Sequence, residues 1–430
     1  MKRRLLPILM TLVLVCALPI WAAFVTSGDV TNPLVCTAGA TSSEESAVEK
    51  LKLAISNGGT VQLTEDIEIT QTLYVERSMT LDLNGHVLKM TGDGSVLRVE
   101  EGPHPVTLTI TDSRSDTSHE DKTLPAGGVI TGGKGTDAGG SVRSVGGAVF
   151  LENGTTLKLE GGTLTGNSSH GSVFINGATF VMTGGTITGE TVGVHNNVGT
   201  FTMIGGRITG CSDRGVYVYN GNMTMSGTAY IGENPNARRE DIYVCESDHK
   251  HTDLSVTGGT IAGKVRIVFL ERLHPTQENL RAAANSVVKE QGVFDGHIKV
   301  EIGTSGTCVD YNSVNFIDEV AKTRTLQLVL ADKKATRPTD PATVNGQTFM
   351  YWAAKGTSEA WDFNTILEVP LTLYAVRTPA SSGGYYYYPT TDTKADDAKG
   401  SPKTADPGVA LYAALSLLSL TGLTCTAKKR

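Results

Sequence analysis

Short hydrophobic runs recur at a nearly constant distance through the middle of the chain, separated by glycine-rich turns. Three clear copies read VFLENGTTLKLEGGTLTG, VFINGATFVMTGGTITG and GVHNNVGTFTMIGGRITG, and a weaker fourth reads GVYVYNGNMTMSGTAYIG. Their aligned glycines, Gly161, Gly184, Gly205 and Gly227, lie 21 to 23 residues apart. A period in the low twenties, made of short strand-like runs, is typical of a solenoid in which each copy forms one coil.

The aligned copies place similar side chains at the same positions of each coil. Because adjacent strands stack about 4.8 Å apart, these side chains would pack on one another, and stacked amides can pair along the stack. We therefore expect these positions to form the core and corners of roughly eight coils rather than a binding site. The positions are Leu157, Phe180, Phe201 and Met223; Leu159, Met182, Met203 and Met225; Leu164, Ile187 and Ile208; and Asn153, Asn176, Asn197 and Asn220.

A short amphipathic helix is predicted just before the first strand-like run. Ser42 and Glu45 have the spacing of a capping box, and Val48, Leu51 and Ile55 share one helical face. The alternating pattern of strands begins directly after this segment. A helix there would cover the open edge of the first coil, which would otherwise recruit other chains.

The strand-and-turn pattern, the capping helix and the run TLDLNGHVL resemble the right-handed parallel β-helix proteins of the pectate-lyase-like superfamily. The resemblance covers residues 43–263 and implies an all-β fold with an N-terminal capping helix. Two polar stretches, 111–147 and 233–253, break the period and are expected to be surface loops. The repeat is lost in residues 264–330, where a β-helix end and a connecting segment both remain open interpretations.

Residues 331–377 carry a different pattern, which resembles the Listeria–Bacteroides (internalin-type B) repeat of bacterial surface proteins. The resemblance implies a small β-grasp-like module, and Phe349, Trp352 and Phe363 are expected to form its core. The chain departs from the family at Gln347, where an aromatic residue is usual, and at Val376-Arg377, which replaces Lys-Trp. The matching features are Pro338, Pro341, Gly346, Phe349, Trp352, Trp361-Asp362-Phe363 and Leu373-Tyr374-Ala375.

The two ends of the chain read as targeting segments. Residues 1–23 combine basic residues, an apolar run and small residues, the pattern of a secretory signal peptide, with a lone membrane anchor as the alternative. Residues 378–400 form a low-complexity linker.

Residues 401–430 join a short motif, an apolar run and a basic end, and resemble the sortase cell-wall sorting signal. The resemblance implies sortase and peptidoglycan as partners, with cleavage after Thr404. A plain tail anchor is the alternative for this hydrophobic, transmembrane-like segment. Two motif positions depart from the family: Ser401 stands for leucine and Ala405 for glycine. The five motif residues are Ser401, Pro402, Lys403, Thr404 and Ala405.

Composition argues against nucleic-acid binding and against a cysteine-ligated metal site. The 430-residue chain has a formal net charge of −7, which becomes more negative when the two basic ends are removed. An acidic protein with no basic cluster is a poor candidate for nucleic-acid binding. The cysteines outside the ends, Cys36, Cys211, Cys245 and Cys308, lack metal-ligand spacing, so we expect buried thiols, with one disulfide as the alternative. No motif indicates a cofactor or a metal.

Two residue pairs are the strongest candidates for catalysis. A lyase needs carboxylates for Ca²⁺ and a basic residue that takes a proton, whereas a glycosidase needs two carboxylates about 5–9 Å apart. Asp213-Arg214 and Glu240-Asp241 both lie in or beside turns. Ion pairs between Glu240-Asp241 and the neighbouring Arg238-Arg239 would explain these four charged residues without a catalytic role.

These features predict a secreted protein attached to the wall of a Gram-positive bacterium. We expect a non-catalytic adhesin whose exposed coil faces and two loops bind host or environmental glycan or a matrix protein. A polysaccharide lyase or glycoside hydrolase is the first alternative, because β-helices host all these activities. A passive surface spacer is the second.

Overall fold

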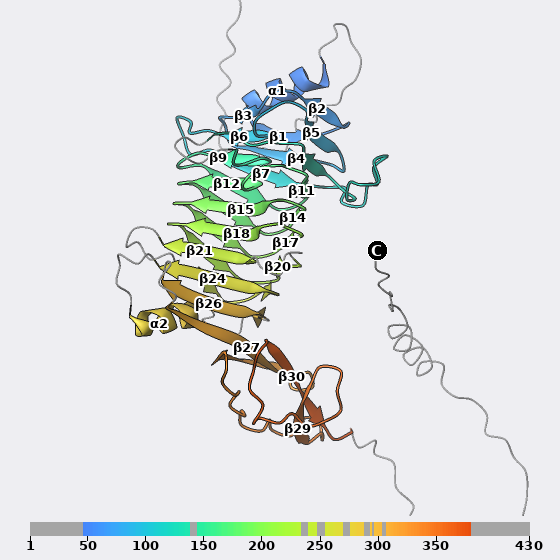
Figure 1. Ribbon diagram of the computed structural model, residues 1–430. Coiled ribbons are helices and arrows are strands. Elements are labelled where there is room, and N and C mark those ends of the chain that lie inside the picture. Colours follow the sequence, from blue (N-terminus) through green and yellow to red (C-terminus); the bar gives the residue numbers. More distant parts are fainter. Residues whose placement is uncertain are drawn as a thin grey trace, which may run out of the picture. The chain divides into compact units, whose positions relative to one another are not determined.

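The computed structural model describes residues 46–137, 144–233, 240–246, 254–269, 276–287, 293–294, 296–302 and 307–379. Over these residues three long sheets of parallel strands stack coil upon coil into a parallel β-helix (Figure 1). The predicted fold class is therefore confirmed. The predicted signal peptide and sorting signal, and the linker beyond Pro379, lie outside the described residues.

Each coil contributes one strand to each sheet. Sheet A contains β1 (Gly59–Gln62), β4 (Met79–Asp82), β7 (Thr107–Thr111), β10 (Thr156–Leu159), β13 (Thr179–Met182), β16 (Thr200–Met203), β19 (Asn222–Met225) and β22 (Leu254–Val256). Sheet B contains β2 (Ile67–Ile69), β5 (Val87–Met90), β8 (Val129–Thr131), β11 (Thr163–Thr165), β14 (Thr186–Thr188), β17 (Arg207–Thr209), β20 (Tyr230–Gly232), β23 (Thr260–Ile261) and β25 (Val293–Phe294).

Sheet C runs through the whole stack and beyond it. Its strands within the stack are β3 (Leu73–Val75), β6 (Leu97–Val99), β9 (Val149–Leu151), β12 (Val173–Asn176), β15 (Val192–Asn197), β18 (Arg214–Tyr219), β21 (Ile242–Glu246), β24 (Lys264–Phe269) and β26 (His297–Ile302). It continues into β27 (Cys308–Asp318), β30 (Leu371–Arg377) and β29 (Phe349–Ala354), and β28 (Thr323–Leu330) pairs with β27. Strands β8 and β21 lie within the stretches 111–147 and 233–253, so the prediction that these stretches are surface loops is wrong for both strands, whose aliphatic residues are buried in the stack.

The predicted hydrophobic ladders fill the interior. The register of sheet A pairs Phe180 with Phe201 and Met182 with Met203, and sheet B pairs Ile187 with Ile208. The rings of Phe180 and Phe201 stack with centroids 4.8 Å apart. All of these side chains are buried, so like packs on like as the period predicts.

The paired glycines serve the corners in two ways. A Cβ atom on Gly184 would lie 2.1 Å from the carbonyl oxygen of Glu160 in the previous coil, so only glycine fits there. Gly185, its neighbour, has a backbone φ of 71°, which residues with a side chain rarely adopt. The GG dipeptide therefore combines close backbone approach with a left-handed turn.

The predicted asparagine ladder is wrong for two of its four members. The Asn197 Nδ2 donates to Asn176 Oδ1 at 3.0 Å, but Tyr219 rather than Asn220 pairs with Asn197. Asn153 lies beside Gly177 instead of Asn176. The cause at Asn153 is that sheet C and sheet A differ in register by one residue. At Asn220 the two sheets keep the same register, and this residue lies one position after Tyr219, the partner of Asn197.

Both ends of the stack are covered by a helix. Helix α1 (Ala47–Asn57) contacts β1, β2 and β3, and buries Leu51 and Ile55. It is capped by Ser46, whose Oγ accepts from the Glu49 N–H at 3.3 Å; the predicted cap at Ser42 and Glu45 falls outside the described residues. Helix α2 (Gln277–Val287) contacts β22, β26 and β27 where sheet A has ended.

The segment 264–330 is largely part of the stack. Strands β24 and β26 extend sheet C in parallel, and then β27 turns antiparallel to β26. The far half of β27 pairs with β28 and, in parallel, with β30. One strand therefore joins the β-helix to the residues that follow.

Residues beyond 331 pack on a second hydrophobic core. Trp352 is buried in this core. Phe349 and Phe363 are partly buried and pack against the core. Residues of the β27–β28 hairpin belong to the same core. Its buried members are Val314, Phe316, Val329, Ala335, Trp352, Leu367 and Leu373. Within the part of the chain that the structure describes, no helix is long and apolar enough to cross a membrane.

Candidate functional site

A continuous column of large side chains lies on the outer face of sheet C. Strand register aligns one residue from each successive strand, while the residues on either side of it in each strand, such as Val216 and Val218, enter the core. Adjacent ring centroids are 4.6 to 5.4 Å apart, which suits tilted and edge-to-face aromatic contacts. The column runs Phe150, Phe174, His195, Tyr217, Tyr243, Arg266 and Lys299.

The first part of this column is covered. Phe150 and Phe174 are only 3% and 1% exposed because Val145, from the predicted loop 111–147, packs on both. The Nδ1 of His170 lies 3.2 Å from that of His195. Burial lowers the pKa of His195 to about 3, so this ring stays neutral. The covered half therefore anchors a loop.

The second part of the column is accessible. Tyr217, Tyr219 and Tyr243 are half-buried, and two arginines flank them. The guanidinium carbon of Arg214 lies 4.4 Å from the ring centroid of Tyr243, and that of Arg266 lies 5.5 Å from it. Such contacts fix both cations over the ring. We call these five residues the tyrosine–arginine face.

Carboxylates pair with both arginines of this face, and Glu240 bridges them. Arg214 Nη1 lies 2.9 Å from Asp213 Oδ2, and its Nε lies 3.7 Å from Glu240 Oε2. Arg266 Nη1 lies 3.2 Å from Glu240 Oε1, and its Nε donates to Glu301 Oε1 at 2.7 Å. Three carboxylates therefore meet on one face, but each is paired with a guanidinium.

The charges of this network are fixed at neutral pH. Burial alone would raise the pKa of Glu301, but hydrogen bonds from Lys299 and Arg266 outweigh it and lower that pKa. Burial raises the pKa of Tyr217 to about 12 and also raises that of Tyr243, so both remain phenols that can donate hydrogen bonds. The face thus offers rigid donors and acceptors of both kinds.

Three of the four predicted catalytic candidates come together in this network. Asp213, Arg214 and Glu240 belong to it, whereas Asp241 is buried with its carboxylate directly below Gly263. The predicted partners of Glu240, Arg238 and Arg239, lie outside the described residues. Within those residues Glu240 contacts Arg214 and Arg266.

Sequence reasoning missed Arg266, Glu301 and both column tyrosines. A signal for them exists in the alternating runs GVYVYN, DIYVCE and KVRIVF. Each run has a large polar residue at the same outward position between two β-branched residues. Aligning the outward positions, as well as the core positions, would have shown the column.

A second acidic residue looks suited to catalysis but is inaccessible. Burial raises the pKa of Glu190 to about 7, the range of a general acid. Its side chain is enclosed at an inner corner, where Asn167 N and Nδ2 donate to it at 3.1 and 3.0 Å and Ser172 Oγ at 3.3 Å. We assign it a structural role, because substrate cannot reach it.

The described residues contain no group of three or more histidine, cysteine or acidic side chains placed to hold a metal ion. Among the described residues, Cys211 is buried, Cys245 is partly buried and Cys308 is exposed, and none of the three forms a disulfide there. The expectation of buried thiols is therefore wrong for Cys308. No known family model matches the chain, and neither does any curated protein sequence.

Proposed function

We propose that this protein is a bacterial surface protein that binds a glycan through the tyrosine–arginine face of its β-helix. The observation that carries the proposal is the accessible half of the sheet C column, where phenols, guanidiniums and carboxylates are held rigidly. Aromatic and arginine side chains are the residues most enriched at binding hot spots. A column that repeats from coil to coil suits a polymer that also repeats.

The charge balance favours binding over catalysis. Asp213, Glu240 and Glu301 each contact a guanidinium. Hydrogen bonds from Lys299 and Arg266 lower the pKa of Glu301, which suits a carboxylate rather than a general acid. The mutual neutralisation of these charges also favours a neutral or weakly charged ligand over a strongly charged one.

Tyrosine substitutions on this face should abolish most of the binding. We expect Tyr217→Ala or Tyr243→Ala to weaken glycan binding about tenfold or more, the loss typical of a hot-spot aromatic residue. The measurement is the dissociation constant of the full chain for a ligand identified on a glycan and matrix-protein array.

Tyr230→Ala is the matched control. Tyr230 also stacks with an arginine, Arg207, whose guanidinium carbon lies 4.0 Å from its ring, but on sheet B. Its substitution should leave affinity unchanged. Equal losses in all three variants, or no binding to any array ligand, would contradict the proposal and, in the second case, favour a passive spacer.

A glycan-cleaving enzyme is the second candidate, favoured by the convergence of Asp213, Glu240 and Glu301 around Arg214 and Arg266. A lyase or hydrolase would release new chain ends from pectin, glycosaminoglycan or mucin glycans. Product release by the wild type that Glu240→Gln abolishes would establish this candidate and replace the adhesin.

The modular order supports attachment to the wall. The secretion signal, the resemblance of residues 43–263 to the pectate-lyase-like superfamily, that of 331–377 to the Listeria–Bacteroides repeat and that of 401–430 to a sorting signal together describe a Gram-positive surface protein. The second core around Trp352, which residues of 331–377 share with the β27–β28 hairpin, supports a folded C-terminal module. Sortase and peptidoglycan are the partners this proposal requires.

Thr404→Ala should release the protein from the wall. In the sorting-signal interpretation sortase recognises the threonine and cuts after it. Alanine keeps the backbone carbonyl but removes the recognised side chain, so most of the protein should move to the membrane or medium. Wall fractions are compared by immunoblot, with Thr393→Ala in the linker as control. Unchanged wall retention of Thr404→Ala would contradict the sorting-signal interpretation. A plain tail anchor would then be the remaining alternative.

A further inference from the structure

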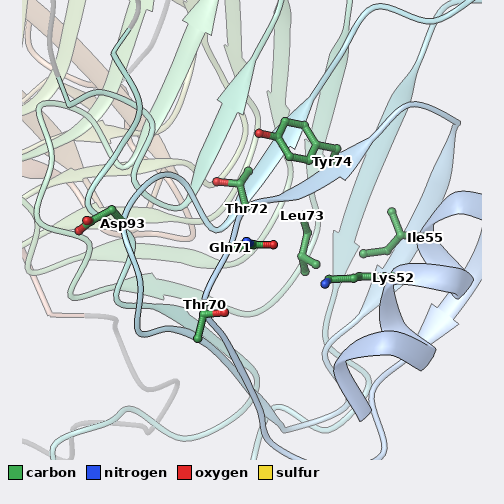
Figure 2. A pocket seen from close by; sticks show the side chains of 8 residues that line it. All are labelled: Lys52, Ile55, Thr70, Gln71, Thr72, Leu73, Tyr74 and Asp93. Atoms are coloured by element: carbon green, nitrogen blue, oxygen red, sulfur yellow. The ribbon is translucent and has the colours of Figure 1, made fainter. Parts of the chain in front are cut away.

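A pocket of about 610 Å³ opens at the N-terminal end of the stack (Figure 2). Helix α1 contributes Lys52 to it, the corner between β2 and β3 contributes Gln71 and Thr72, and β3 contributes Tyr74. Asp93 reaches it from the corner of the next coil. In Figure 2, Gln71 and Thr72 lie between Lys52 and Asp93. Residues from three separate segments therefore surround one hollow.

The two charged residues of the pocket are already neutralised. Lys52 Nζ lies 2.9 Å from Glu49 Oε1, and Asp93 Oδ1 lies 2.8 Å from Lys134 Nζ. The hydrogen bond from Lys134 lowers the pKa of Asp93, so the carboxylate stays ionised and paired. With no unbalanced charge, the pocket presents amide, hydroxyl, ammonium and carboxylate groups that suit a ligand rich in hydroxyls.

Tyr74 adds an apolar surface at the side of the pocket. The residue is 53% exposed, so its ring is available to a ligand. A ring that faces solvent beside several hydrogen-bonding groups can take the apolar face of a sugar while those groups bind its hydroxyls.

The pocket also lies on the same column as the tyrosine–arginine face. Register pairs Tyr74 with Arg98 and Arg98 with Phe150, so Tyr74 begins the outward column that continues through Phe174 to Tyr217. Arg98 lies with its guanidinium carbon 4.9 Å from the Phe150 ring centroid. Two accessible parts of one column are thus separated by the covered part beneath Val145.

We propose that this pocket binds the terminal neutral pyranose of a glycan chain, an inference that rests on the proposed glycan-binding function. The sugar ring stacks on Tyr74, and its hydroxyls bond to Gln71, Thr72 and Asp93. Lys52 donates from the opposite wall. Helix α1, with Lys52 and Ile55, forms a wall of the pocket, and a wall on this side suits a chain end better than an internal unit of a polymer.

Saturation-transfer NMR on the full chain tests the pocket with free monosaccharides. Glucose, galactose and N-acetylglucosamine are the neutral probes, and glucuronate is the charged one. We expect at least one neutral sugar to bind in the millimolar range, more tightly than glucuronate. Tyr74→Ala should weaken that binding about tenfold. Lys52→Ala should also weaken it, whereas Lys50→Ala, on the same helix but outside the pocket, should not.

The outcomes separate this inference from the proposed function. No signal from any neutral sugar, a signal that Tyr74→Ala leaves unchanged, or tighter binding of glucuronate would overturn the pocket assignment. If Tyr217→Ala still weakens binding of an array glycan in that case, the glycan-binding function stands and only the pocket inference fails. If the wild type binds neither free sugars nor array glycans, both fail.

Discussion

Replacing Arg377 with methionine is expected to destabilise the second hydrophobic core, around Trp352, by about 3–5 kcal/mol, the cost of breaking a buried ion pair. The side chains of Arg377 and Asp318 are 3% and 1% exposed. Arg377 Nε contacts both Asp318 carboxylate oxygens at 3.1 Å, and its Nη1 and Nη2 donate to the carbonyls of Gln347 and Ala342 at 2.8 and 2.9 Å. Methionine fills similar volume but leaves Asp318 buried and ionised without its partner.

Chemical denaturation followed by tryptophan fluorescence measures this effect, since Trp352 and Trp361 both belong to the affected core. Arg337→Met is the control, because Arg337 and Asp340 pair at 2.7 Å with side chains that are more than half exposed. Exposed pairs contribute about 1 kcal/mol or less. Similar unfolding curves for the two variants would show that the buried pair does not stabilise this core.

The second large effect is a dependence of stability on pH that Glu190→Gln removes. The folded state holds Glu190 with a pKa of about 7, above its usual value of 4.5, because burial disfavours the charged form. Below pH 4.5 the residue is protonated in both states. Between pH 4.5 and 7 only the folded state binds the proton, so the contribution of Glu190 to stability falls with rising pH and levels off above 7.

The size of this decrease in the free energy of unfolding follows from the shift in the pKa of Glu190. For a fully enclosed carboxyl it is about 3 kcal/mol. The free energy of unfolding is measured from pH 4 to 8. Glu190→Gln cannot ionise, so its curve should lack this component, whereas Glu160→Gln, at an exposed corner, should keep it. Folding lowers the pKa of His195 from 6.5 to about 3, so that residue raises stability with pH over part of this range, and the Glu190 component is the difference between the wild-type and Glu190→Gln curves. A difference that does not fall between pH 4.5 and 7 would contradict the assignment.

The regular part of the fold could be predicted because it depends on one repeated contact. Phe180 on Phe201, Met182 on Met203 and Ile187 on Ile208 all follow from a constant period. The asparagine ladder failed at Asn153 because the corner between two sheets absorbs one extra residue there, and a hydrophobic period does not show where that happens. Asn220 failed because it lies one residue after the position that pairs with Asn197. Ser46 caps α1 within the predicted helical segment, where several serines compete for the position.

The candidate site was only partly predictable for a related reason. Asp213, Arg214 and Glu240 attracted attention as charged pairs beside turns. Their neighbours Arg266 and Glu301 lie on later strands, and only the register of sheet C brings them together. Outward positions of a coil vary from copy to copy, so the alignment that identifies the core gives no reason to compare them.

The shared strand β27 has a consequence for mechanical load. Its first half pairs with β26 of the stack, and its second half pairs in parallel with β30, the last strand before the C-terminal segment. If the protein is tethered to the wall through that segment, as proposed, tension pulls β27 and β30 lengthwise in opposite directions. Their hydrogen bonds and the Asp318–Arg377 pair are then strained together in shear, rather than peeled apart one by one. Such a junction would resist pulling forces that would unzip an antiparallel hairpin loaded at its open end.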